Sequence, residues 1–204
     1  MLPKKTWLPM LALPALALTG CSNGTGPDGM SDSDAQLIAF EVTSASIGAL
    51  NSGTAGGAVQ GFDALGASAS SVPVALNFNY SHTESCPLFG RIGVTGRMSG
   101  SIETDTGSGV LWLQVTETLT DCTFDTTNGD LVVNGSPSIT LTGNFTFLNN
   151  QPATQQSLTL SGGFRWQFDD GNSRFCALNL TMNISYGGGA TTVSGTVCGN
   201  PVNF

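Results

Sequence analysis

From Val72 onward, apolar and polar residues alternate with a period of two, and this pattern limits the possible folds more than any other feature of the chain. Successive side chains of a β-strand point to opposite faces, so such alternation predicts half-buried strands. One run, for example, places Leu158 and Leu160 on one face and Thr159 and Ser161 on the other. Short polar turns separate the runs, with no helical pattern between them. We therefore expect this part of the chain to form a mainly β domain.

Seven or eight strands are expected in this domain. Parallel pairing would need long crossover connections, so the short turns predict a single antiparallel meander. The apolar face of the sheet has to be covered, since exposing it costs about 25 cal/mol per Å². A strongly curved sheet or small barrel meets this need, and a two-layer sandwich is the alternative. The predicted strands lie near residues 72–80, 92–102, 111–119, 139–147, 158–168, 176–186 and 193–197, with a short extra strand at 131–133.

One short helix is expected before the strands, from about residue 34 to residue 50. Ser33 and Gln36 have the spacing of a capping box, and a broad apolar stripe follows them. Val42, Thr43 and Ile47 inside the segment are β-branched and weaken its helical propensity. The Gly-, Ala- and Ser-rich stretch that follows shows no core pattern. Residues 34–71 are therefore expected to be a helix with a loose connection to the β domain at 72–204.

The N-terminal residues have the pattern of an export signal. Lys4 and Lys5 precede an apolar run at 7–18, which is too short to span a bilayer as a stable helix. An ordinary secretory signal or a short N-terminal anchor would share this pattern. The end of the run distinguishes between these alternatives and a lipoprotein signal.

The apolar run ends in the motif Leu18-Thr19-Gly20-Cys21. An aliphatic residue, two small residues and a cysteine resemble the lipobox of bacterial lipoproteins, in which the cysteine is acylated with chains such as palmitate. The resemblance implies a signal peptide at 1–20 that is removed, and then a flexible tether at 21–33. In that family, an aspartate directly after the cysteine retains the protein at the inner membrane. Ser22 stands at this position, so the resemblance favours the outer membrane.

Removal of residues 1–20 would leave a strongly acidic chain. Both lysines lie in that segment, so four arginines face 14 Asp and Glu residues, and the formal charge becomes −10. No basic patch is available to neutralise phosphates, which excludes nucleic acid as a class of partner. The expected partners are the membrane, reached through the lipid anchor, and a lipid or another protein of the cell envelope.

Four cysteines follow Cys21, and an even number in an exported chain predicts two disulfides. A zinc site is the alternative, but the chain has no C-x-x-C pair and a single histidine. Opposed residues of a hairpin lie at equal distances from its turn. This spacing pairs Cys86 with Cys122 around a turn at 103–108, and Cys176 with Cys198 around a turn at 187–189.

The pairing of Cys176 with Cys198 conflicts with the alternation of the last predicted strand. Val193 and Val197 place odd-numbered positions of the last strand inward, whereas Cys198 is even. A bulge at Gly195, or a bend at Cys198 and Gly199, would remove the conflict.

Candidate site residues are few, and each has a structural interpretation. His82 stands beside hydroxyl residues and a carboxylate, which could form part of a hydrolase site. No nucleophile elbow accompanies it, so we expect His82 to be an ordinary polar residue at the end of a strand. Trp112 falls on the polar face of its strand, where it either marks a binding patch or packs against a second layer. Four aspartates could offer oxygens to calcium, although Asn-Gly and Asp-Gly pairs beside them favour simple turns: they are Asp125, Asp130, Asp169 and Asp170.

These features favour a membrane-anchored, non-catalytic binding or interaction module of the cell envelope, with no cofactor. One version carries an apolar ligand inside a curved sheet. A structural surface protein and a small outer-membrane β-barrel are the alternatives. An enzyme is the least favoured class, because no catalytic constellation is recognisable in the sequence.

Overall fold

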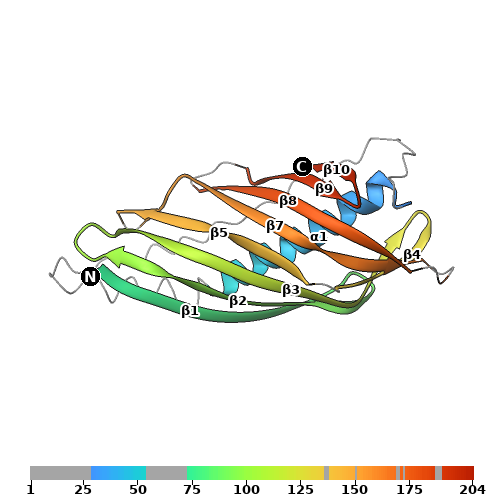
Figure 1. Cartoon of the computed structure of the whole chain (residues 1–204), viewed down its shortest axis with the longest axis horizontal. Helices are drawn as coiled ribbons and strands as arrows, with labels where there is room; N and C mark the ends of the chain where they lie inside the picture. The colour runs from blue at the N-terminus through green and yellow to red at the C-terminus, as the bar shows by residue number, and fades with distance from the viewer. Residues whose placement is uncertain are drawn as a thin grey trace, which may run out of the picture.

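The computed structural model describes residues 29–53, 73–135, 138–149, 151–168, 171, 173–186 and 190–204. The described chain forms one helix and ten strands, and all ten strands belong to one antiparallel sheet (Figure 1). The sheet is curved, with the helix lying across one of its faces. The mainly antiparallel β fold with a single helix is therefore as the sequence predicts, and the curved sheet replaces the two-layer alternative.

The alternation predicts eight of the strands, and two short ones are additional. The two additional strands, β6 and β10, have only two and four residues, so they carry little pattern. The elements are α1 (Asp32–Gly53), β1 (Pro73–Ser85), β2 (Phe89–Glu103), β3 (Ser108–Thr126), β4 (Gly129–Asn134), β5 (Ile139–Leu148), β6 (Gln151–Pro152), β7 (Gln155–Gln167), β8 (Ser173–Ser185), β9 (Thr192–Val197) and β10 (Asn200–Asn203).

The sheet is a meander in which β4 and β5 share one position. The strand order is β1-β2-β3-β4-β7-β8-β9-β10, and β5 also pairs with both β3 and β7. β3 is 19 residues long, so its first half pairs with β5 and its last residues pair with β4. β4 and β5 thus act as one strand that is interrupted after Asn134. The edges of the sheet are β1 and β10.

A bulge in β3 changes which of its residues point inward. Asp121 has a positive φ of 48°, and the register against β2 shifts between Phe89 and Arg91. Thr120 and Asp121 are both exposed, so the buried positions change from odd to even between Leu119 and Cys122. The bulge therefore turns Cys122 toward the interior, where its disulfide forms.

The helix begins two residues before its predicted start, and its cap is Ser31 rather than Ser33. The backbone N–H of Asp34 donates to Ser31 Oγ at 3.2 Å, which satisfies one of the free donors of the first turn. Asp32 and Asp34 lie in that turn, where negative charge is favourable to the helix dipole. The predicted capping box at Ser33 and Gln36 is therefore wrong, because a better-placed hydroxyl precedes it.

The helix α1 lies between the two edge strands of the sheet. It packs against β1 and β2 on one side and against β9 and β10 on the other. Phe40 of α1 lies 6.0 Å from Phe204 between ring centroids, and Asn200 Nδ2 donates to the carbonyl of Met30 at 3.0 Å. Because both edges of the sheet contact the same helix, the concave face is closed by α1.

The core lies between α1 and the concave face. Ile38, Ala39 and Val42 of the helix are completely buried there, together with the inward side chains of nearly every strand. Burial of this face offsets the weak helical propensity of α1. The largest fully buried side chains are Phe124, Phe164, Met30, Ile38, Ile92, Ile102, Leu111, Leu113, Leu131, Ile139, Leu141 and Leu158.

Both predicted disulfides are present. Cys86, directly after β1, is bonded to Cys122 of β3, with Cα atoms 5.4 Å apart. Cys176 of β8 is bonded to Cys198, with Cα atoms 4.6 Å apart. The four cysteines of the described chain are therefore paired with one another, and the zinc alternative is wrong.

Cys198 reaches its partner through a bend. Cys198 and Gly199 have φ values of 53° and 78° and form a two-residue turn between β9 and β10, as in a type I′ hairpin. The register between β8 and β9 stays constant on both sides of Gly195, so this strand has no bulge there. Of the two explanations for the parity conflict, the bend is the right one.

Candidate functional site

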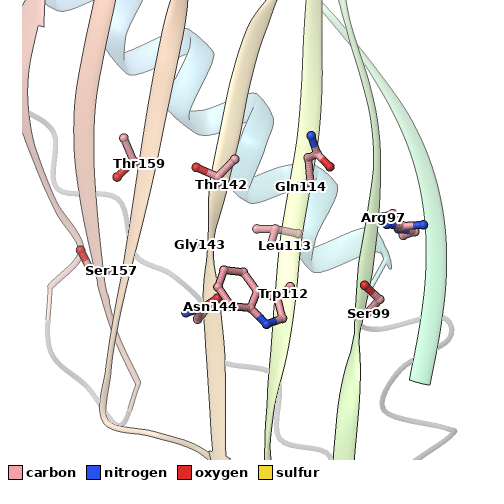
Figure 2. Close-up of a pocket in the computed structure, with 10 residues that line it drawn as sticks. All are labelled: Arg97, Ser99, Trp112, Leu113, Gln114, Thr142, Gly143, Asn144, Ser157 and Thr159. Carbon is pink, nitrogen blue, oxygen red and sulfur yellow. The ribbon is translucent and has the colours of Figure 1, made fainter. Parts of the chain in front are cut away.

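The outer face of the sheet carries a shallow hollow around Trp112 (Figure 2). Its volume is about 350 Å³, at the lower end of the range for small-molecule sites. Figure 2 shows α1 behind the strands, so the hollow and the closed core lie on opposite sides of the sheet. The lining residues are Arg97, Ser99, Trp112, Leu113, Gln114, Thr142, Gly143, Asn144, Ser157 and Thr159.

The cross-strand register brings these residues together from β2, β3, β5 and β7. Ser99 of β2 and Asn144 of β5 lie on either side of Trp112 in β3. In the neighbouring row, Gln114 lies opposite Arg97 of β2. Side chains of opposed residues on one face are within contact distance of each other. The hollow is therefore a product of strand pairing, and no local sequence motif encodes it.

Trp112 dominates the hollow. Its side chain is 65% exposed, as its parity in the alternation predicts. The indole lies over β5 beside Gly143 and Asn144, and Figure 2, which looks onto the outer face, shows its six-membered ring nearly face-on. One face of the ring is thus turned to solvent and open to stacking.

The polar groups around Trp112 are available to a ligand. The side chains of Arg97, Gln114 and Asn144 make no hydrogen bond or ion pair with another described residue, and the hydroxyl groups of the hollow make none either. Arg97 carries the single charge among the lining residues. The hollow therefore offers both donors and acceptors around an apolar platform, with one cation at its rim.

A second unusual group lies in the interior. Glu117 of β3 is completely buried on the concave face, between Val94 of β2 and Ile139 of β5. Its Oε1 accepts a hydrogen bond from the hydroxyl of Ser46 in α1, and its Oε2 has no partner among the described residues. Burial raises the pKa of Glu117 to about 8, and the bond from Ser46 lowers it by less. At neutral pH this side chain is therefore mainly a neutral acid.

Glu117 was missed by the sequence interpretation, although a signal was present. It occupies an inward position of the alternation between Val115 and Leu119, where an apolar residue is expected. A charged residue at such a position indicates a buried polar contact. Its partner, Ser46, is 71 residues away in the chain and could not be predicted from spacing.

His82 and the hydroxyls beside it lie on opposite sides of β1. His82 and Glu84 face α1, and a Cβ placed on Gly48 would lie 3.6 Å from His82 Nε2 and 3.7 Å from Glu84 Oε2. Ser81 and Ser85 are exposed on the other face. The structure therefore does not bring this histidine together with its neighbouring hydroxyls as a base and a nucleophile.

Two of the calcium candidates lie in β3 and β4, on either side of the turn that joins these strands. Asp125 and Asp130 oppose each other in the hairpin, and both are exposed. Asn128 Nδ2 donates to Asp34 of α1 at 3.4 Å, so the turn packs against the start of the helix. Asp169 and Asp170 lie outside the described residues. Within the described ranges, no three or more His, Cys, Asp or Glu side chains group closely enough to hold a metal ion.

The predicted membrane anchor lies outside the part of the chain that the structure describes. Cys21 and residues 22–28 of the predicted tether precede Gly29, the first described residue. The last residues of that predicted tether belong to the folded part, since Met30 is buried and Asp32 begins α1. The single described helix, α1, lacks the apolar character needed to cross a bilayer.

Comparison of the chain with models of protein families, with curated proteins and with solved structures found no match.

Proposed function

We propose that this chain is a lipid-anchored protein of the cell envelope that binds a ligand through the hollow around Trp112, without catalysing a reaction. The motif ending in Cys21 supports the anchor, and Ser22 after it favours the outer membrane. Eight peptide units separate Cys21 from Gly29. Fully extended, they span about 30 Å at most, so the β domain works close to the membrane surface.

The observation that carries the binding role is the exposure of Trp112 among unpaired polar groups. Exposed aromatic residues are enriched at binding sites because they offer a large contact area with few rotatable bonds. The concave face is less suited to this role, since α1 fills it with side chains such as Ile38 and Val42 that are completely buried. A ligand on that face would first have to displace the helix.

Site-specific photocrosslinking in intact cells tests the binding role. A photoreactive amino acid placed at Thr142, which lines the hollow, should give a defined adduct. The matched control is the same amino acid at Thr118, which is exposed on the same face of the sheet, six residues beyond Trp112 along β3. An adduct at position 142 that Trp112→Ala removes supports the proposal. Absence of any adduct at position 142 contradicts it.

The anchor is tested by substituting the residues on which it depends. Cys21→Ser should abolish incorporation of labelled palmitate and release the protein from the membrane fraction, because the acyl chains supply about 0.8 kcal/mol per buried methylene. Ser22→Asp should keep the label and move the protein to the inner membrane, and Ser22→Ala is the matched control that should change neither. A Cys21→Ser protein that still takes up label would show that another residue is acylated.

A further inference from the structure

We infer that the ligand of the Trp112 hollow is a neutral glycan built of hexopyranose units. The inference rests on the proposed binding role and assigns a chemical class to its ligand. It follows from three properties of the hollow: an open indole face, a rim of uncharged polar side chains, and the absence of any carboxylate among its lining residues.

The open indole face selects a ligand with an apolar side of similar size. A pyranose ring presents several C–H groups on one side and its hydroxyls around its edge. C–H groups of such a ring pack on an aromatic face, where the negative π-cloud attracts their weakly positive hydrogens. Trp112 offers this face 65% exposed.

The rim matches the hydroxyls of the same sugar. Each hydroxyl both donates and accepts a hydrogen bond, and so do the amides and hydroxyls of the hollow. Asn144 lies beside the indole and Gln114 lies in the next row along β3, and Ser99, Thr142 and Thr159 extend the polar border over three strands. Arg97 adds a multiple donor that bonds two neighbouring oxygens at once. The polar lining residues run from Ser99 of β2 to Thr159 of β7, which gives room for more than one sugar unit.

Charge separates a glycan from the other ligands that stack on tryptophan. Nucleic-acid bases also stack, but a chain of formal charge −10 after loss of residues 1–20 repels their phosphates, and one arginine cannot neutralise several of them. Quaternary amines bind in cages of several aromatic rings, and Arg97 would repel them. The buried core of a protein–protein interface is more apolar than the rest of the surface, whereas most side chains around Trp112 are polar. The net negative charge of the chain also disfavours polyanionic glycans.

The test uses the full chain, purified from membranes in a detergent that has no sugar head group, because such a head group would compete for the site. Neutral tetrasaccharides of glucose, mannose, galactose and N-acetylglucosamine are titrated by calorimetry, with a sulfated tetrasaccharide as the anionic counterpart. At least one neutral probe should bind with a Kd below about 1 mM, and the sulfated probe more weakly. In a Trp166→Phe background whose residues 1–20, and with them Trp7, have been removed, binding should also change the fluorescence of Trp112.

Variants then assign the binding to the hollow. Trp112→Ala should weaken binding at least about tenfold, the loss expected for one stacked ring, and Asn144→Ala about fivefold. Val110→Ala is the matched control on the same face of β3, and it should leave the Kd unchanged. Binding of a neutral probe that Trp112→Ala does not weaken overturns the inference.

The crosslinking experiment separates failure of the glycan assignment from failure of the binding role. If no neutral probe binds and the adduct at position 142 is a protein or a lipid, the hollow is a binding site for another class of ligand and the glycan assignment is wrong. If no probe binds and position 142 gives no adduct, both proposals are wrong.

Discussion

A neutral carboxylic acid inside an apolar core couples the stability of this protein to pH. Glu117 has lost water on all sides, and the hydrogen bond from Ser46 satisfies only one of its two oxygens. In the unfolded chain the same group titrates near its ordinary value of 4.5. The folded state therefore retains a proton that the unfolded state releases at any pH between about 4.5 and 8.

The free energy of unfolding should consequently fall as pH rises through that range. The contribution of Glu117 is complete below pH 4.5 and is lost by about pH 8, with a slope of up to about 1.4 kcal/mol per pH unit. The pKa of Glu41 is also raised, first by burial and then by the charge of Glu84, which adds a trend of the same sign. Glu117→Gln keeps an acceptor for Ser46 and cannot ionise, so it should flatten the slope.

Denaturant titrations at several pH values between 5 and 8.5 measure this slope. The matched control is Glu103→Gln, an exposed glutamate at the end of β2, which should leave the slope as in the unchanged protein. A Glu117→Gln protein with the full slope would show that other groups cause it.

The two most unusual residues differ in how far the sequence reveals them. The parity of the alternation predicts that Trp112 is exposed, and this prediction is confirmed. Its neighbours in the hollow, such as Arg97 and Thr159, come from strands whose register depends on turns and bulges, so the sequence does not predict them. Ser46 and Glu117 likewise meet only through tertiary packing.

At the scale of the elements, the period-two pattern predicts most of the sheet because one face of every long strand is buried. It does not predict the bulge at Asp121, because only Cys122 and Phe124 are buried after it in β3, and two inward positions are too few to reveal the change of parity. It also does not predict β10, where Pro201 and only four residues leave too short a pattern. The sequence also does not predict that β4 and β5 share one position between β3 and β7, because a break in the alternation separates them.

The disulfide between β8 and the turn after β9 should contribute strongly to the stability of the folded protein. Cys176 and Cys198 are 22 residues apart, and closing a loop of that size in the unfolded chain is worth about 3 kcal/mol. Replacing both cysteines with alanine should lower the free energy of unfolding by about this amount. Denaturant titration measures the loss, with treatment of the unchanged protein by a reductant as a comparison. A loss below about 1 kcal/mol would contradict the expectation.

At the scale of the whole molecule, we expect α1 to keep the two edges of the sheet from pairing with other chains. Unpaired edge strands are templates for association, and covering them is a common protection. Because α1 contacts both β1 and β10, loosening the helix exposes both edges together.

A pair of cavity variants tests this role of the helix. Ile38 of α1 and Leu160 of β7 are both completely buried, and truncation of either to alanine should cost about 3 kcal/mol. Ile38→Ala should also cause self-association that grows with protein concentration, whereas Leu160→Ala, in the middle of the sheet, should not. Light scattering and analytical ultracentrifugation distinguish the two. Equal association of both variants would show that the helix does not protect the edges.

The position of α1 also makes the closed fold depend on both ends of the described chain. The helix is the first described element in the chain, and β10, one of the strands that it packs against, is the last described one. A chain that lacks residues 200–203 therefore leaves the β10 side of the helix uncovered. We expect such a shortened chain to be more open to proteases than a chain that includes β10.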